Sequence, residues 1–124
     1  MSATILVVED EPDIRLMARF MLEGAGHRVV ETASGNEAVS MLDEERPDLV
    51  LLDIRLPDIE GWEVLRRLRS SDRLRELPVL IMSAHSSGDF RARACREGSD
   101  GYLVKPFREN ELLEWVNKLL EPRP

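Results

Sequence analysis

The chain has 124 residues, which is enough for one hydrophobic core but too few for two. Apolar residues make up 43% and charged residues 33% of the sequence, a balance that excludes a disordered or low-complexity chain. The formal net charge of -7 argues against direct binding of nucleic acid, because an acidic surface repels phosphate groups.

No apolar run approaches the ~20 residues that cross a bilayer, and the amino-terminal segment carries acids where a signal peptide needs basic residues. We therefore predict a soluble cytoplasmic domain without membrane contact. The single cysteine, Cys95, excludes an intramolecular disulfide and a zinc site built on cysteines. We expect it to be half-buried on a helix.

Short apolar runs alternate with helical patterns from the start of the chain. Residues 5–8 are apolar and rich in β-branched side chains, which predicts a strand buried on both faces. Residues 12–24 have a proline in the first turn, apolar side chains at helical spacing and a final glycine, which predicts an amphipathic helix. A second strand is expected around residues 29–30, and residues 34–37 have the spacing of a capping box that begins the next helix.

The same alternation continues to the end of the chain. We expect strands at residues 49–52, 79–82 and 101–104 and helices around residues 64–68, 87–97 and 112–120, of which 87–97 has the weakest apolar stripe. Alternating strands and helices in one domain predict an α/β fold, with a doubly wound five-stranded parallel sheet and helices on both faces. Ligands of such sheets bind at the carboxyl ends of the strands.

Polar residues stand at these strand ends. Glu9 and Asp10 follow the first strand, Asp53 the third, Ser83 the fourth and Lys105 the fifth. Three carboxylates at one edge repel one another unless a cation neutralises them, and oxygen ligands favour a hard ion such as Mg²⁺. With a metal on one side and a lysine on the other, the edge is suited to phosphoryl transfer.

Each of these residues also has a purely structural interpretation. A single acid after a strand is commonly a helix cap or a solvated loop residue. Lys105 could be no more than a salt-bridge partner of Asp53, and the Ser83 hydroxyl could simply bond the backbone of its turn. The combination at one sheet edge favours the functional interpretation.

Four segments resemble the receiver domain of response regulators. They are LVVEDE at residues 6–11, LLDIRLPDIEG at 51–61, IMSAH at 81–85 and GYLVKPF at 101–107, in the order and spacing of that family. The resemblance, to a single-domain receiver of the chemotaxis type, spans residues 1–124, with a core at about 3–121 and a short C-terminal tail. It implies a flavodoxin-like fold with strand order 2-1-3-4-5.

The resemblance also implies roles for the strand-end residues. Asp53 matches the aspartate that accepts a phosphoryl group from a phosphohistidine of a sensor histidine kinase or histidine phosphotransfer protein. Glu9 and Asp10 match the acids that bind Mg²⁺ together with it, and the backbone carbonyl of Arg55 completes the metal ligands. Lys105 matches the lysine that contacts the phosphoryl group, and its peptide bond to the following proline is expected to be cis.

Further positions match the residues that switch and tune such domains. Ser83 and Tyr102 match the hydroxyl and aromatic residues that move when the acceptor is phosphorylated. The structural alternative for Tyr102 is a ring packed at the sheet edge with its hydroxyl in water. Arg55 and His85 match the positions that tune the lifetime of the phosphorylated state, and both are expected to face solvent.

The leading hypothesis is a receiver domain that catalyses its own phosphorylation and dephosphorylation and is no conventional turnover enzyme. It would signal to a downstream protein target or effector domain as a monomer or weak dimer. One alternative is an interaction module that is read without phosphate. Another is a metal-dependent phosphohydrolase, although Arg55 stands where its second aspartate would be needed. Because no effector domain follows Pro124, the chain is expected to be a stand-alone regulator or an excised receiver.

Overall fold

Strands and helices alternate along residues 2–121, the part of the chain that this computed structural model describes. The elements are β1 (Thr4–Val8), α1 (Pro12–Gly24), β2 (Arg28–Thr32), α2 (Gly35–Glu45), β3 (Leu49–Asp53), α3 (Gly61–Ser70), β4 (Val79–Ser83), α4 (Gly88–Glu97), β5 (Gly101–Val104) and α5 (Glu109–Leu120). Every predicted strand and helix is present. The predicted tail, residues 122–124, lies outside the described residues.

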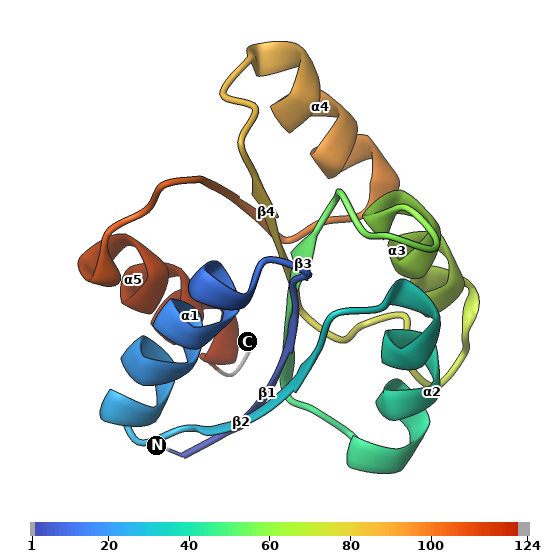
Figure 1. The fold of residues 1–124 in the computed structure, drawn as a ribbon. Coiled ribbons are helices and arrows are strands. Elements are labelled where there is room, and N and C mark those ends of the chain that lie inside the picture. The colour runs from blue at the N-terminus through green and yellow to red at the C-terminus, as the bar shows by residue number, and fades with distance from the viewer. Residues whose placement is uncertain (1, 122–124) are drawn as a thin grey trace.

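The five strands form one parallel sheet with the order β2-β1-β3-β4-β5 (Figure 1), which confirms the doubly wound, flavodoxin-like fold. The register aligns the carboxyl ends of the strands: Val8 pairs with Leu52, and Ser83 pairs with Val104. Residues that directly follow these strands therefore emerge at one edge of the sheet.

Helices cover both faces of the sheet, as predicted (Figure 1). Helices α1 and α5 pack on one face, where their buried side chains meet alternate residues of β1, β3 and β4. Helices α2, α3 and α4 pack on the other face. All side chains of β3 and β4 are buried, because both faces of these strands are covered.

No helix among residues 2–121 is long and apolar enough to cross a membrane.

The start of α2 differs in part from the predicted capping box. The Ser34 hydroxyl accepts a hydrogen bond from the Glu37 amide at 3.1 Å, as expected for an N-cap. The Glu37 carboxylate, however, accepts from the Thr32 hydroxyl at 2.6 Å, so the reciprocal half of the box is replaced by a bond to the end of β2. Asp58, from the loop after β3, accepts the amides of Gly35 and Asn36 at 2.9 and 2.8 Å.

These bonds tie the loop after β3 to the start of α2. The Asn36 amide and the Ser34 hydroxyl hold the pKa of the Asp58 carboxyl well below its usual range. Because the carboxylate stays ionised at any ordinary pH, the link between the loop and the helix N-terminus is maintained.

At the amino-terminal ends of the strands, opposite the carboxyl edge, the Arg69 guanidinium joins several segments. It donates to the carbonyls of Gly98, Arg75 and Leu77 at 2.8, 2.9 and 2.7 Å and to the Asp100 carboxylate at 2.8 Å. Asp100 in turn accepts the amide of Val79, the first residue of β4, at 2.9 Å. We call this arrangement the Arg69 clamp; it fixes the amino-terminal ends of β4 and β5.

Cys95 and His27 both lie away from the carboxyl edge of the sheet. Cys95 is exposed, so the prediction of a half-buried cysteine is wrong. The reason is that α4 rests on the sheet along a narrow line and fully buries only Ala94. His27 is buried, and its Nδ1 accepts the Ala3 amide at 3.1 Å, a structural role far from the strand ends.

Candidate functional site

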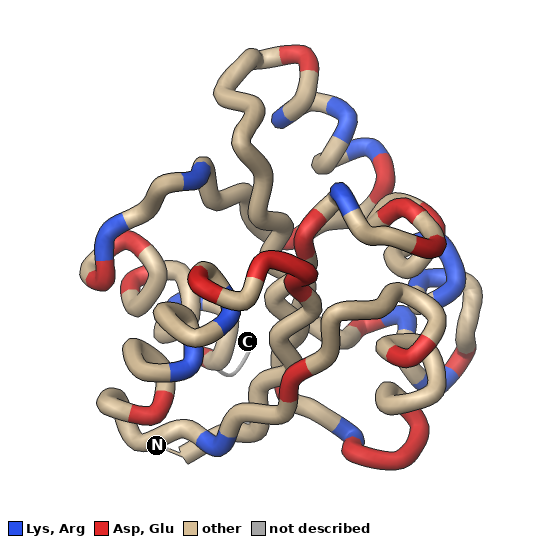
Figure 2. Tube along the Cα trace, viewed as in Figure 1, with Lys and Arg blue, Asp and Glu red and all other residues tan. Residues whose placement is uncertain are grey.

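Three acids converge at the carboxyl edge of the sheet. Glu9 and Asp10 follow β1, Asp53 ends β3, and one carboxylate oxygen from each lies within 4.8 Å of the others. Figure 2 shows the acidic turn after β1 beside the acidic end of β3. Glu9 and Asp53 are buried, whereas Asp10 is exposed. This donor set of closely spaced carboxylate oxygens fits a hard divalent cation.

Lys105 faces the same acids from the end of β5. Its Nζ lies 2.5 Å from Glu9 Oε1, 3.2 Å from Asp53 Oδ2 and 4.0 Å from Glu11 Oε1. Its amide donates to the Ser83 carbonyl at 2.8 Å, and its peptide bond to Pro106 is cis, as the resemblance implies. One ammonium thus faces three carboxylates, and the edge keeps an excess of negative charge.

The electrostatics of this edge follow from burial. Burial raises the pKa of Glu9 from 4.5 to about 7, against the lowering effect of its hydrogen bond to Lys105. Burial alone would lower the pKa of Lys105, but the hydrogen bond that its ammonium donates to Glu9 and the charge of Asp53 raise this pKa above its usual value. The lysine is therefore charged, and a bound cation would relieve the cost of ionising Glu9.

Arg55 lies directly beside the acceptor candidate. Its side chain is exposed, as predicted, and its amide donates to Asp53 Oδ1 at 3.3 Å. This bond orients the Asp53 carboxylate. The ligand role predicted for the Arg55 carbonyl stays a prediction.

Ser83, His85 and Tyr102 form one hydrogen-bonded group next to Asp53. The buried Ser83 Oγ accepts the His85 amide at 3.1 Å, which is the structural alternative for this hydroxyl. The Tyr102 hydroxyl donates to the His85 carbonyl at 2.6 Å, and the tyrosine as a whole is only 7% exposed. The alternative of a Tyr102 hydroxyl in water is therefore wrong, because the turn after β4 supplies a closer acceptor. His85 itself is exposed, as expected.

Residues 5–117 match the family model described as the response regulator receiver domain. This chain belongs to that family. Its receiver domain is 38% identical over 120 residues to the phosphate regulon transcriptional regulatory protein PhoB of Escherichia coli K12, a match that covers 97% of this chain and 52% of PhoB. The chain thus spans about half the length of the PhoB proteins it matches.

Solved structures of other receiver domains have the same fold. A putative response regulator from Chloroflexus aurantiacus superposes with a TM-score of 0.93 and 32% identity, covering 97% of this chain and 98% of that one. The receiver domain of the sensor histidine kinase PA1611 from Pseudomonas aeruginosa has a TM-score of 0.89, 31% identity and the same two coverages. That structure has a magnesium ion coordinated in its active-site cleft. The predicted function, a receiver domain of two-component signalling, is confirmed.

Sequence reasoning missed the importance of Gly61 in this receiver domain. Its amide donates to the Ile54 carbonyl at 2.8 Å, and a Cβ at this position would overlap the Asp53 carbonyl oxygen and lie 2.8 Å from Ile54 Cα. Both neighbours are backbone atoms of the strand end that carries the acceptor candidate. Gly61 stands in the segment that resembles the family, but one sequence carries no signal that distinguishes a glycine required by a close approach from a simple loop glycine.

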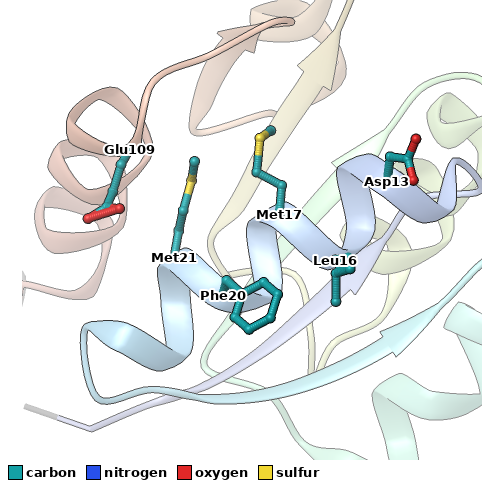
Figure 3. Close-up of a pocket in the computed structure, with 6 residues that line it drawn as sticks. All are labelled: Asp13, Leu16, Met17, Phe20, Met21 and Glu109. Carbon is teal, nitrogen blue, oxygen red and sulfur yellow. The ribbon is translucent and has the colours of Figure 1, made fainter.

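Helix α1 of the receiver domain begins at the carboxyl edge of the sheet and carries an exposed apolar face. Leu16 is 52% and Phe20 67% exposed, and both line a hollow of about 460 Å³ that extends from Asp13 to Glu109 of α5. Figure 3 shows Leu16 and Phe20 on one side of α1, apart from Met17 and Met21. The two methionines pack against the core between α1 and α5, whereas the Leu16 and Phe20 side chains are largely exposed.

Proposed function

We propose that Asp53 accepts a phosphoryl group from a phosphohistidine of a sensor histidine kinase or histidine phosphotransfer protein. One observation carries this proposal: a buried Asp53 carboxylate lies 3.2 Å from the Lys105 ammonium and within 4.8 Å of the Glu9 and Asp10 carboxylates. An Asp53 oxygen attacks phosphorus, the bond from phosphorus to the donor's imidazole nitrogen breaks, and that nitrogen keeps the electron pair. The imidazole then binds a proton from solvent.

Glu9, Asp10 and Asp53, with the Arg55 carbonyl, are the residues proposed to hold Mg²⁺. When bound, Mg²⁺ would neutralise negative charge on the phosphoryl oxygens and on the attacking carboxylate. Lys105 offers a fixed ammonium to a phosphoryl oxygen, and its pairing with the buried Glu9 keeps it charged and in place. Ser83 Oγ accepts the His85 amide, which leaves its own proton for a phosphoryl oxygen.

The switch proposed for this domain uses the bonds around His85. Attraction of the Ser83 hydroxyl to the phosphoryl group would change its bond to the His85 amide. The Tyr102 hydroxyl holds the carbonyl of the same residue, so the tyrosine is positioned to follow that movement. A repacked surface of α4, β5 and α5 would then be read by a downstream protein target or effector domain.

The first test is phosphorylation itself. Incubation with Mg²⁺ and acetyl phosphate is expected to add one phosphoryl group, and peptide mapping by mass spectrometry is expected to place it on Asp53. Asp53→Asn is expected to take up none, because the amide cannot act as the nucleophile. Phosphate on another residue, or none in the presence of Mg²⁺, would contradict the proposal.

A Mg²⁺ titration and a phosphate monoester assay separate the two alternatives. An interaction module read without phosphate would neither bind Mg²⁺ in a titration nor take up phosphate. A phosphohydrolase would turn over phosphate monoesters, whereas we expect a phosphoryl group on Asp53 with a finite lifetime and no turnover of monoesters.

Arg55 and His85 are proposed to control how long the phosphoryl group stays on Asp53. Both line a hollow of about 500 Å³ next to Ile54, which directly follows Asp53. Arg55→Ala and His85→Ala are each expected to shorten the lifetime about threefold, because a smaller side chain admits water more easily. Decay of the phosphorylated chain after removal of the donor measures this. Unchanged lifetimes in both variants would remove the proposed role.

The exposed face of α1 is proposed to receive a helix of the phosphodonor protein. The face is apolar, and it lies on the helix that begins two residues after Asp10, next to the acceptor edge. Phe20→Ser is expected to slow phosphotransfer from a histidine-phosphorylated protein donor about tenfold and to leave uptake from acetyl phosphate unchanged.

Glu44→Ser, an exposed change on α2, serves as the matched control for Phe20→Ser. Equal transfer rates for the unaltered chain and Phe20→Ser would contradict docking at this face.

The domain, with its core at residues 3–121, is proposed to act in the cytoplasm as a monomer or weak dimer, without direct contact to nucleic acid. The exposed single thiol of Cys95 suits a reducing compartment.

A further inference from the structure

The backbone of His85 is fixed on both sides by the two hydroxyl residues of the site. Its amide donates to Ser83 Oγ at 3.1 Å, and its carbonyl accepts from the Tyr102 hydroxyl at 2.6 Å. The imidazole ring extends from this fixed backbone toward α4. It stacks on the ring of Phe90 with a centroid distance of 4.1 Å and an interplanar angle of 13°.

Phe90 is itself held in place. It lies in the first turn of α4, where its amide donates to the N-cap hydroxyl of Ser87 at 3.3 Å. Its ring lies 5.9 Å from the buried Trp62 ring of α3, and the Arg93 guanidinium covers that indole at 4.4 Å. The Phe90 ring is therefore anchored between α3 and α4, and His85 stacks on a fixed surface.

His85 and Phe90 line the same hollow as Ile54 and Arg55, the two residues after Asp53. The stacked imidazole thus lines a hollow whose wall includes the two residues that follow the acceptor candidate. A ring held on Phe90 has few rotamers available, whereas an exposed histidine without this contact would sample several.

We propose that Phe90 is a positioning residue that keeps the His85 ring in this hollow and so slows hydrolysis of the phosphorylated state. The inference rests on the proposed phosphorylation of Asp53. In hydrolysis, a water oxygen attacks phosphorus, the bond from phosphorus to the Asp53 oxygen breaks, and the carboxylate keeps the electron pair. Inorganic phosphate leaves, and the proton of the water passes to solvent or to the phosphate.

The size of the effect follows from the strength of the stack. An aromatic pair of this kind changes the populations of the held and free ring by a factor of about two to ten. Phe90→Leu is therefore expected to shorten the lifetime of the phosphorylated chain about threefold. Phe90→Tyr keeps the aromatic face and is expected to retain the lifetime of the unaltered chain.

The test is a mutant cycle on the full chain phosphorylated with acetyl phosphate and Mg²⁺. Decay is followed by intact-mass spectrometry after the donor is removed, for Phe90→Leu, His85→Ala and the double variant. If Phe90 acts through His85, Phe90→Leu shortens the lifetime in the unaltered chain but changes nothing in the His85→Ala background. Phe90→Met gives a second truncation in case the leucine variant folds poorly.

Proton NMR of the His85 ring provides a readout that needs no phosphate. The stacked ring is expected to show an upfield-shifted carbon-bound proton in the unaltered chain and in Phe90→Tyr, and a normal shift in Phe90→Leu. An undiminished effect of Phe90→Leu without His85, an unchanged lifetime, or an unshifted proton in the unaltered chain would each overturn the inference. If the unaltered chain takes up no phosphate, the proposed function fails as well.

Discussion

Replacing Gly61 with alanine is expected to reduce phosphoryl uptake by Asp53 about 100-fold. The added Cβ would overlap the Asp53 carbonyl oxygen and lie 2.8 Å from Ile54 Cα, and backbone atoms of a buried strand end cannot move aside cheaply. The strand end must shift, and the Asp53 carboxylate shifts with it. A displacement of about 1 Å at a reacting group is enough for a loss of this size.

The same change is expected to destabilise the fold by about 3 kcal/mol, the upper part of the range for overpacking a core. Uptake from acetyl phosphate and chemical denaturation measure the two effects. Gly88→Ala is the matched control, because a Cβ at Gly88 meets no atom within 4 Å. Normal uptake by Gly61→Ala would show that the strand end accommodates the methyl group, contrary to the geometry described here.

Replacing Arg69 with methionine is expected to lower the free energy of unfolding by about 3 kcal/mol while phosphoryl uptake by the folded protein stays unchanged. The variant removes four hydrogen bonds, three to backbone carbonyls and one to the Asp100 carboxylate. The stability effect is large because the Arg69 side chain is only 19% exposed. The chemistry is spared because the clamp lies at the edge opposite Asp53.

Arg69→Lys is expected to recover little of this stability, because one ammonium cannot reach three carbonyls and a carboxylate in the planar geometry of a guanidinium. Arg67→Met is the control: its ion pair with Glu63 is exposed and is worth about 0–1 kcal/mol. Chemical denaturation curves of the three variants measure the differences. Similar losses for Arg67→Met and Arg69→Met would argue against the clamp.

The parts of this fold that follow from the order of apolar and polar residues along the chain could be predicted. Residues 49–52 are continuously apolar because β3 is covered on both faces, and the acid that ends the run marks the edge where a ligand can bind. Parallel register then brings Glu9, Asp53 and Lys105 together without any knowledge of their contacts. Their proximity was predicted for this reason.

Contacts that depend on how elements pack could not be predicted. The exposure of Cys95 depends on how narrowly α4 rests on the sheet, and the bond from the Tyr102 hydroxyl depends on the path of the turn after β4. The Glu37 carboxylate could accept from the Ser34 amide, as in a capping box, or from the Thr32 hydroxyl. The position of Thr32 at the end of β2 decides in favour of the hydroxyl. The close approach of Gly61 to the end of β3 depends on the path of the loop after that strand. The stack of Phe90 on His85 likewise depends on the path of the loop between β4 and α4. Residue types alone do not specify these paths.

The Arg69 clamp also has an evolutionary consequence. One guanidinium secures the amino-terminal ends of β4 and β5, so the rigidity of that half of the sheet does not depend on the residues around Asp53. Substitutions at exposed positions such as Arg55 and His85 can then accumulate at little thermodynamic cost. Descendants of this chain could acquire signals that persist for different times while the scaffold keeps the same resistance to unfolding.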